Sequence, residues 1–411
     1  MRPAPLLVAG LTLAALPAAS LGAWGPAVPI APPGAIVASG DVAAGAGGRA
    51  VAAWLRTDRH GTRVLVSSRA AGRWTPQAAL SGPGAARPRA AVNALGDAAV
   101  AWVGDRAIVA AVRRGPAGRW SASLVARADG TIRDLRLAID RVGRPMVLWS
   151  EAMDSGFVAR VASRPSASAG WRVRPARIGT PGPTAPALAL SAGAGALVAW
   201  TDDGRTLASR TVTGDFESPR EVAGEAGGRP AAAIGPTGTT LTAWSARLPG
   251  GTSVVQAAGR TDPGDAWGEP DDVGIGATPV AALNEDGDAV VAWSLGGAGG
   301  PQGVESVTRA GPTGVWRATT VVPRRSCNCT LRVAGVGVAD DGTAVVAWRR
   351  DDEDGGTGGG VAALSAGRED WARAGIGGGR PDATPAVTAA GGGATALWAT
   401  QGSGVRAAVL R

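Results

Sequence analysis

Charged side chains follow four tryptophans of this sequence, and they are the residues whose types and spacing could do chemistry. Each group comes after an apolar run that ends at Trp54, Trp149, Trp200 or Trp348. Gathered at one opening, such guanidinium and carboxylate groups could bind a polar ligand or a partner. The alternative is that they are ordinary solvated loop charges. The predicted ligand-binding residues are Arg56, Asp58, His60, Glu151, Asp154, Asp202, Asp203, Arg349 and Asp351.

These residues give little basis for catalysis. Acid–base cleavage of a glycosidic bond needs two carboxyl groups about 5–9.5 Å apart, and Glu151 and Asp203 are only nominal candidates for that pair. A serine hydrolase would have to use His60, the one histidine, and the chain has no Gly-x-Ser-x-Gly turn. We therefore predict no catalytic residues. A hydrolase or lyase that uses the loop carboxylates stays open as the alternative.

The sequence also contains few residues that could bind a metal or take part in redox chemistry. One His and two Cys exclude zinc sites built from several such ligands. The acidic segment 349–356 lacks the ligand spacing of an EF-hand calcium loop, which favours a solvated loop. Cys327 and Cys329 are predicted to form a local, strained disulfide, since an exported protein meets an oxidising compartment. We predict no metal and no cofactor.

The basic charge of the chain is spread along it. All 41 basic residues counted as Lys+Arg are arginines, and the formal net charge is +8. A protein that reads nucleic acid would concentrate such charge and add free aromatic residues for stacking. Here only short pairs such as Arg113–Arg114 occur. We predict a protein or an anionic envelope polysaccharide as the partner, and no nucleic acid.

A repeat organises these groups along the chain, and tryptophan reveals it. One tryptophan series ends the apolar runs at gaps of 44 to 55 residues, a second follows glycine-rich turns, and together they use all 15 tryptophans. Six residues before the first-series tryptophan, seven of eight units carry a glycine; the exception is Ala194. The first series is Trp54, Trp102, Trp149, Trp200, Trp244, Trp293, Trp348 and Trp398. The second is Trp24, Trp74, Trp120, Trp171, Trp267, Trp316 and Trp371, with Phe216 in the vacant position.

Each repeat unit is expected to form four strands. In the second unit we predict strands at 90–95, 98–102, 106–112 and from Trp120, with Gly96–Asp97 turning the first hairpin. The strands are apolar on both faces, so each sheet must be covered on both sides. This period predicts an all-β fold, a single β-propeller with eight four-stranded blades; seven blades are the alternative.

The ends of the chain predict how the ring closes. The last unit stops at its third strand, near 405–410, and segment 23–30 resembles the missing fourth strand. We expect the N-terminal strand to complete the last blade, which leaves no open sheet edge. In a propeller, the loops between second and third strands share one face with the inter-blade connections. The charged groups after the first-series tryptophans are therefore expected at that face.

The turn before the second tryptophan series resembles the Asp-box, or bacterial neuraminidase repeat, of sialidase-type propellers. That pattern is Ser-x-Asp-x-Gly-x-Thr-Trp, and segments 309–316 and 260–267 keep its Gly and Trp but not its Ser and most of its Asp. The resemblance implies a sialidase-like propeller. It does not imply sialidase chemistry, because those enzymes use a Tyr nucleophile and this chain has no Tyr.

The N-terminus predicts export. Residues 1–23 combine Arg2, an apolar core near 6–16 and small residues after Pro17, as a secretory signal peptide does. No later run is long enough for a transmembrane helix. Residues 24–411 are then one propeller domain, expected as a secreted or envelope-associated monomer. The function that follows is non-catalytic binding of a protein or an envelope glycan.

Overall fold

The computed structural model shows strands throughout, and one 3-10 turn, η1 (Ala46–Gly48), within the described part of the chain. The predicted signal peptide, 1–23, lies outside the described residues. The structure describes residues 24–410 apart from 32–35, 155, 167–168, 179–185, 192, 194, 213–214, 225–227, 249, 263, 296–301, 326–328, 354–356, 376–384, 391–392 and 401–403.

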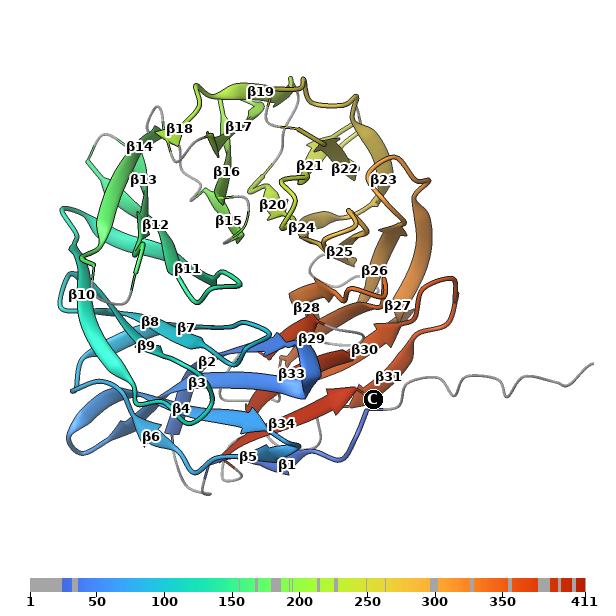
Figure 1. Ribbon diagram of the computed structural model, residues 1–411. Coiled ribbons are helices and arrows are strands. Elements are labelled where there is room, and N and C mark those ends of the chain that lie inside the picture. The colour runs from blue at the N-terminus through green and yellow to red at the C-terminus, as the bar shows by residue number, and fades with distance from the viewer. Residues whose placement is uncertain are drawn as a thin grey trace, which may run out of the picture.

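Eight antiparallel sheets form a closed ring of blades, as predicted (Figure 1). The eight-blade prediction is confirmed and the seven-blade alternative is wrong. Blade 1 contains β2 (Ile36–Gly45), β3 (Arg49–Asp58), β4 (Gly61–Ala70), β5 (Arg73–Trp74) and β6 (Ala78–Ala79). Blade 2 contains β7 (Ala85–Val92), β8 (Ala98–Gly104), β9 (Ala107–Arg113) and β10 (Ser121–Arg127). Blade 3 contains β11 (Thr131–Ile139), β12 (Pro145–Met153), β13 (Gly156–Ser163) and β14 (Arg172–Ile178). Blade 4 contains β15 (Ala187–Ser191), β16 (Gly195–Asp202), β17 (Arg205–Val212), β18 (Asp215–Phe216) and β19 (Arg220–Ala223).

The second half of the ring repeats this order. Blade 5 contains β20 (Ala231–Ile234), β21 (Thr240–Arg247), β22 (Ser253–Arg260) and β23 (Asp271–Ile275). Blade 6 contains β24 (Ala277–Leu283), β25 (Ala289–Leu295), β26 (Gln302–Arg309) and β27 (Arg317–Arg325). Blade 7 contains β28 (Cys329–Val338), β29 (Ala344–Asp352), β30 (Thr357–Leu364) and β31 (Ala372–Gly375). Blade 8 contains β32 (Ala386–Ala390), β33 (Gly393–Thr400), β34 (Gly404–Leu410) and β1 (Val28–Pro29).

The N-terminal strand closes the ring, as predicted. β1 pairs antiparallel with β34, Val28 opposite Ala407. The backbone N–H of Gly25 donates to the carbonyl of Val409 at 2.9 Å, and that of Ile30 donates to the carbonyl of Val405 at 2.9 Å. Blade 8 is thus built from both ends of the chain, and β34 has a partner on each side.

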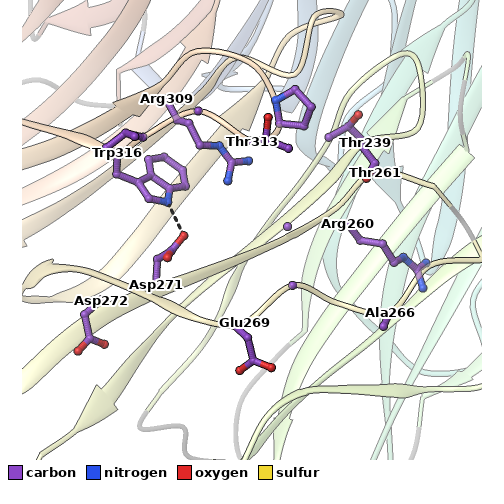
Figure 2. Close-up of a pocket in the computed structure, with 15 residues that line it drawn as sticks. Thr239, Arg260, Thr261, Ala266, Glu269, Asp271, Asp272, Arg309, Thr313 and Trp316 are labelled. Carbon is purple, nitrogen blue, oxygen red and sulfur yellow. Dashed lines mark hydrogen bonds between the residues drawn. The ribbon is translucent and has the colours of Figure 1, made fainter.

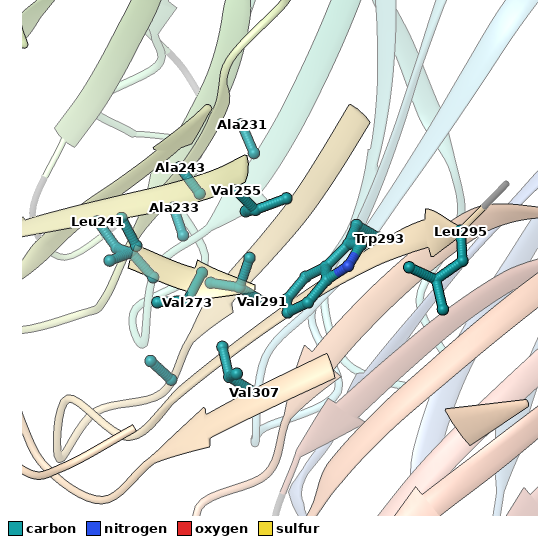
Figure 3. Close-up of a cluster of buried hydrophobic side chains, with 12 residues drawn as sticks. Ala231, Ala233, Leu241, Ala243, Val255, Val273, Val291, Trp293, Leu295 and Val307 are labelled. Atoms are coloured by element: carbon teal, nitrogen blue, oxygen red, sulfur yellow. The ribbon is translucent and has the colours of Figure 1, made fainter. Parts of the chain in front are cut away.

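Small residues and buried tryptophans explain how the blades pack. The innermost strand of each blade contacts the innermost strand of the next, and β32 contacts β2. Between blades 5 and 6, Trp293 of β25 is 1 % exposed and packs with Val255, Val273 and Leu295 (Figure 3). An aromatic ring buries a large apolar area, so one such residue per blade seals an interface that alanine alone would leave loose.

Candidate functional site

The hairpins between second and third strands carry most of the predicted binding residues at one end of the blades. Asp58 and His60 lie in the β3–β4 turn, where the backbone N–H of His60 donates to Oδ1 of Asp58 at 2.8 Å. Nε of Arg59 lies 2.9 Å from Nε2 of His60. The His60 backbone hydrogen bond, aided by Arg63 and Arg56, holds the pKa of Asp58 below its ordinary value of 3.8.

The remaining hairpin residues stay apart from one another around the ring. Asp154 and Asp203 are exposed in the turns of blades 3 and 4, and Asp202 is half-buried at the end of β16. On β29, Nε of Arg349 donates to Oδ1 of Asp351. None of the nine predicted residues lines the cavities described below, so a shared binding pocket for them stays a prediction.

Glu151 differs from its neighbours because its carboxylate is fully buried. Oε1 accepts the Trp149 indole N–H at 2.6 Å and lies 3.1 Å from Nε of Arg160. Oε2 accepts the backbone N–H groups of Asp129 and Gly130 at 3.0 and 3.2 Å. These donors come from β12, β13 and the connection between blades 2 and 3. Glu151 therefore fastens that connection to blade 3, and its carboxylate is not exposed to solvent.

Cys329 at the start of β28 is disulfide-bonded. Cys327, the other cysteine of the sequence, lies outside the described residues.

The axis of the ring contains a cavity of about 660 Å³ that the sequence did not reveal. Its walls are the innermost strands β11, β15, β20, β24 and β28, made largely of Ala, Val, Leu and Pro. Three arginines, Arg136, Arg229 and Arg332, stand among these apolar residues. Arg229 lies just before β20, Arg332 is in the first half of β28, and Arg136 is in the second half of β11.

One buried carboxylate gathers arginines from three blades in this channel. Asp134 is 8 % exposed. Its Oδ1 lies 3.0 Å from Nη1 of Arg136 and 3.7 Å from Nη2 of Arg89, and its Oδ2 lies 3.3 Å from Nη2 of Arg229. These side chains come from blades 3, 2 and 5. Asp134 is thus an anchor that brings three guanidinium groups to one place.

Hydrogen bonds to backbone carbonyl groups fix the orientation of the same guanidinium groups. Nε of Arg89 donates to the carbonyl of Leu135 at 2.8 Å, and Nε of Arg136 donates to that of Leu188 at 3.1 Å. Nη2 of Arg229 donates to the carbonyl of Pro186 at 3.2 Å. Each arginine therefore reaches across to a neighbouring blade. A planar guanidinium held this way presents its remaining N–H groups in a fixed direction.

The cluster is positively charged. Arg89, Arg136 and Arg229 face Asp134 and the nearby Asp41, which leaves one net positive charge, and Arg332 adds another. Burial lowers the pKa of Arg136, Asp134 and Asp41 raise it, and Arg89 and Arg229 lower it further. Because a guanidinium stays protonated in proteins, the charge persists and attracts anions into the channel.

β-bulges let charged residues occupy strands that otherwise carry small ones. The pairing of β7 with β8 shifts between Ala86 and Arg89, and the pairing of β11 with β12 shifts between Ile132 and Asp134. Arg87 within the first bulge has a φ of 53°. A bulge adds a residue to one strand and turns the next side chain in a new direction. Here the two bulges place Arg89 and Asp134 at the axis.

A sequence signal for this cluster does exist. Asp41, Arg89 and Arg136 all stand seven residues before the repeat glycine, in three successive units. A charge at the same position of three innermost strands contradicts the expectation that the strands are apolar on both faces. Counting charges by repeat position, in place of loop position, would have predicted the cluster.

Within the described residues, no group of three or more His, Cys, Asp or Glu is placed to hold a metal ion. The described helical segments include none with the length and apolar character to cross a membrane.

Comparison with known proteins identifies the fold only. No model of a protein family matches the chain, and no curated protein matches its sequence. The WD40 domain of SCAP from fission yeast is 9 % identical over 94 % of this chain and 98 % of that one, with a TM-score of 0.56. An ulvan lyase of polysaccharide lyase family PL25, bound to -[GlcA(1-4)Rha3S]-, is 11 % identical over 93 % and 94 %, with a TM-score of 0.50. A Hadza microbial sialidase is 13 % identical over 74 % and 73 %, with a TM-score of 0.39.

These structures are β-propellers of varied function, and at such identities they show the fold alone. The sialidase-like character of the repeats stays a prediction, because no family model carries it.

Proposed function

We propose that this protein is an exported, non-catalytic propeller that binds an acidic cell-envelope glycan at the arginine cluster of its channel. The observation that carries the proposal is the convergence of Arg89, Arg136 and Arg229 on Asp134. Guanidinium groups match carboxylate and sulfate groups in shape and charge, and here they are held ready before a ligand arrives.

The walls of the channel favour a slender ligand. Its small and apolar residues leave room for a chain end or a single sugar unit, and Arg136, Arg229 and Arg332 are part of the wall. An acidic glycan is the first class to test, since one propeller with this fold was solved with -[GlcA(1-4)Rha3S]- bound.

The alternative function, a hydrolase or lyase acting on polysaccharide, needs a carboxylate that can exchange a proton. Asp134 accepts from Arg136, from Arg229 and from the backbone N–H of Leu135 at 2.8 Å, and it forms an ion pair with Arg89, which suits an anchor better than a base. Incubation with the glycan, followed by assays for new reducing ends and for unsaturated products, separates the two functions. Product formation would replace the binding proposal by the enzymatic one.

The binding proposal is tested with a uronate-bearing polysaccharide and a neutral one at physiological salt. We expect saturable binding of the acidic polymer only, because guanidinium groups held in place by Asp134 can form paired hydrogen bonds with a uronate, and salt weakens such contacts less than diffuse attraction. The double variant Arg229→Gln/Arg332→Gln should weaken this binding about tenfold or more. Arg133→Gln/Arg368→Gln removes equal charge from two exposed arginines outside the cluster and should leave it unchanged. Equal losses in both variants, or binding that vanishes with salt, would reduce the interaction to diffuse attraction.

A further inference from the structure

A second cavity, of about 620 Å³, lies between blades 5 and 6, and Figure 2 shows the residues that line it. It lies at the end of the blades away from the hairpins between second and third strands. Its walls come from the turns between third and fourth strands, which include Thr261, Thr313 and Trp316, and from the hairpin residue Thr239. The axial cavity is lined by the innermost strands of blades 3 to 7, and the two cavities share no lining residue. The two sites are therefore separate.

The cavity contains a buried arginine with unused donors. Arg309 is 8 % exposed, and its guanidinium carbon lies 4.6 Å from the centroid of the Trp316 ring. Nε and Nη2 are buried and donate to no acceptor in the described part of the chain. Burial lowers the pKa of Arg309, and Asp271 opposes that effect. A buried cation without acceptors is costly, so an unpaired guanidinium facing a cavity points to a ligand.

Two arginines at the same repeat position show how a neighbouring blade can satisfy this side chain. Arg113, Arg260 and Arg309 hold the same position, each paired with the residue four before the first-series tryptophan of its blade. Nη1 of Arg113 donates to Oγ of Ser68 in blade 1 at 2.9 Å. Nη2 of Arg260 donates to Oε1 of Glu217 in blade 4 at 2.6 Å. In both cases, the preceding blade supplies the acceptor.

Blade 5 has glycine at both positions that could supply an acceptor to Arg309. Gly268 follows Trp267 as Glu217 follows Phe216. Gly259 pairs with the residue three before Trp244. Its counterpart in blade 4 is Arg210, which pairs with the residue three before Trp200. Two long side chains of the blade 4–5 interface are thus missing from the blade 5–6 interface. Their absence opens the cavity and leaves Arg309 unpaired.

We propose that the cavity between blades 5 and 6 is a binding site for a carboxylate group, which pairs with Arg309 as Glu217 pairs with Arg260. The ligand carboxylate would accept from Nε and Nη2, the two donors that a bidentate arginine contact uses. The hydroxyls of Thr261 and Thr313 line the same cavity and can serve other polar groups of the ligand.

Acidic residues at the rim do not occupy the guanidinium. Asp271 accepts the indole N–H of Trp316 at 3.0 Å. Glu269 and Asp272 are exposed, and Figure 2 shows their carboxylates pointing away from Arg309. Water and salt screen the exposed carboxylates at the rim, but they screen the buried guanidinium much less. At the inner end of the cavity, the positive charge of Arg309 therefore dominates the electrostatic potential that a ligand meets.

Calorimetric titration of the full chain tests this proposal with probes that share only the carboxylate. Sodium glucuronate represents a sugar acid, a short peptide with one glutamate and blocked ends represents a protein side chain, and glucose is the uncharged probe. We expect one or both acids to bind at a site that persists in Arg229→Gln/Arg332→Gln, with a stoichiometry of one in that variant, and glucose not to bind. The acid that binds shows whether the carboxylate of the ligand belongs to a sugar acid or to a protein side chain. Absence of saturable binding by both acids would overturn the proposal.

The repeat itself supplies matched variants. Gly268→Glu places the missing carboxylate next to Arg309; the new Cβ would lie 3.3 Å from the Gly259 carbonyl oxygen, which a small shift accommodates. This variant should keep or raise the melting temperature and weaken acid binding at least about tenfold, because its own side chain fills the site. Glu217→Gly should create a second site at Arg260 and raise the stoichiometry to two.

Three outcomes would overturn the proposal: unchanged affinity in Gly268→Glu, unchanged affinity in Arg309→Gln, or acid binding that is lost instead in Arg229→Gln/Arg332→Gln. The last outcome would assign the acid to the axial cluster. Conversely, the wild-type protein could bind the small acids at Arg309 and fail to bind the acidic polysaccharide. That result would overturn the proposed function alone, so the proposed function and the carboxylate site can fail separately.

Discussion

At the residue scale, Glu151 shows how a charged residue found by sequence can have a structural task. The prediction placed it at a binding face, but its carboxylate accepts three hydrogen bonds, forms an ion pair with Arg160 and is fully buried. We expect Glu151→Gln to lower the free energy of unfolding by about 2–4 kcal/mol, since a neutral amide loses the ion pair and cannot accept all three hydrogen bonds. Denaturant unfolding measures this. Asp154→Asn, in the exposed turn of the same blade, is the control and should change stability little.

Asp58 gives a pH prediction at the same scale. Its carboxylate is stabilised by the His60 backbone N–H and by nearby arginines, so its pKa in the folded protein lies below the ordinary 3.8. A carboxyl group with a depressed folded pKa stabilises the fold above its unfolded pKa and loses that contribution as the pH falls through the folded value. Carbon-detected NMR titration of Asp58 should give a midpoint below 3.8. A midpoint above it would show that the turn does not hold in solution.

At the element scale, the outer strand of one blade must leave room for the tryptophan of the next. A Cβ on Gly274 of β23 would lie 2.4 Å from the Trp293 ring, whose N–H donates to the carbonyl of Ile275 at 2.8 Å. We expect Gly274→Ala to destabilise the protein by about 1–3 kcal/mol because the ring has no free volume to move into. Thermal unfolding compares it with Gly264→Ala, where a Cβ meets nothing within 4 Å. Equal stability of the two variants would contradict this packing.

The strands were predictable because a fixed repeat constrains them. The second unit was expected to have strands at 98–102 and 106–112, and the structure has Ala98–Gly104 and Ala107–Arg113. The first strand was expected at 90–95 and runs over Ala85–Val92, because its bulge extends it toward the preceding connection. Bulges depend on pairing with a neighbour. The axial cluster, which two bulges build, was therefore missed, although the charges of Asp41, Arg89 and Arg136 marked it.

At the scale of the whole molecule, the ring depends on a strand from the other end of the chain. The pairing of β1 with β34 is short, but Trp24 adds a bridge to Leu410 and packs against the core of blade 8. Sequence predicted this closure because the last unit lacked one strand. Closure removes the free edge of β34, and a free edge would invite pairing with another molecule.

A protein that begins at residue 32, compared with one that begins at residue 24, tests this closure. We expect a lower midpoint of unfolding and concentration-dependent association, because β34 loses its outer partner while seven blades keep theirs. Size-exclusion chromatography with light scattering measures the association. Val28→Thr is the control: that side chain is 46 % exposed, so the backbone pairing survives and the protein should elute as the wild type does. A truncated protein with the wild-type midpoint and elution would mean that blade 8 stands without β1, and that the ring is held by contacts between innermost strands alone.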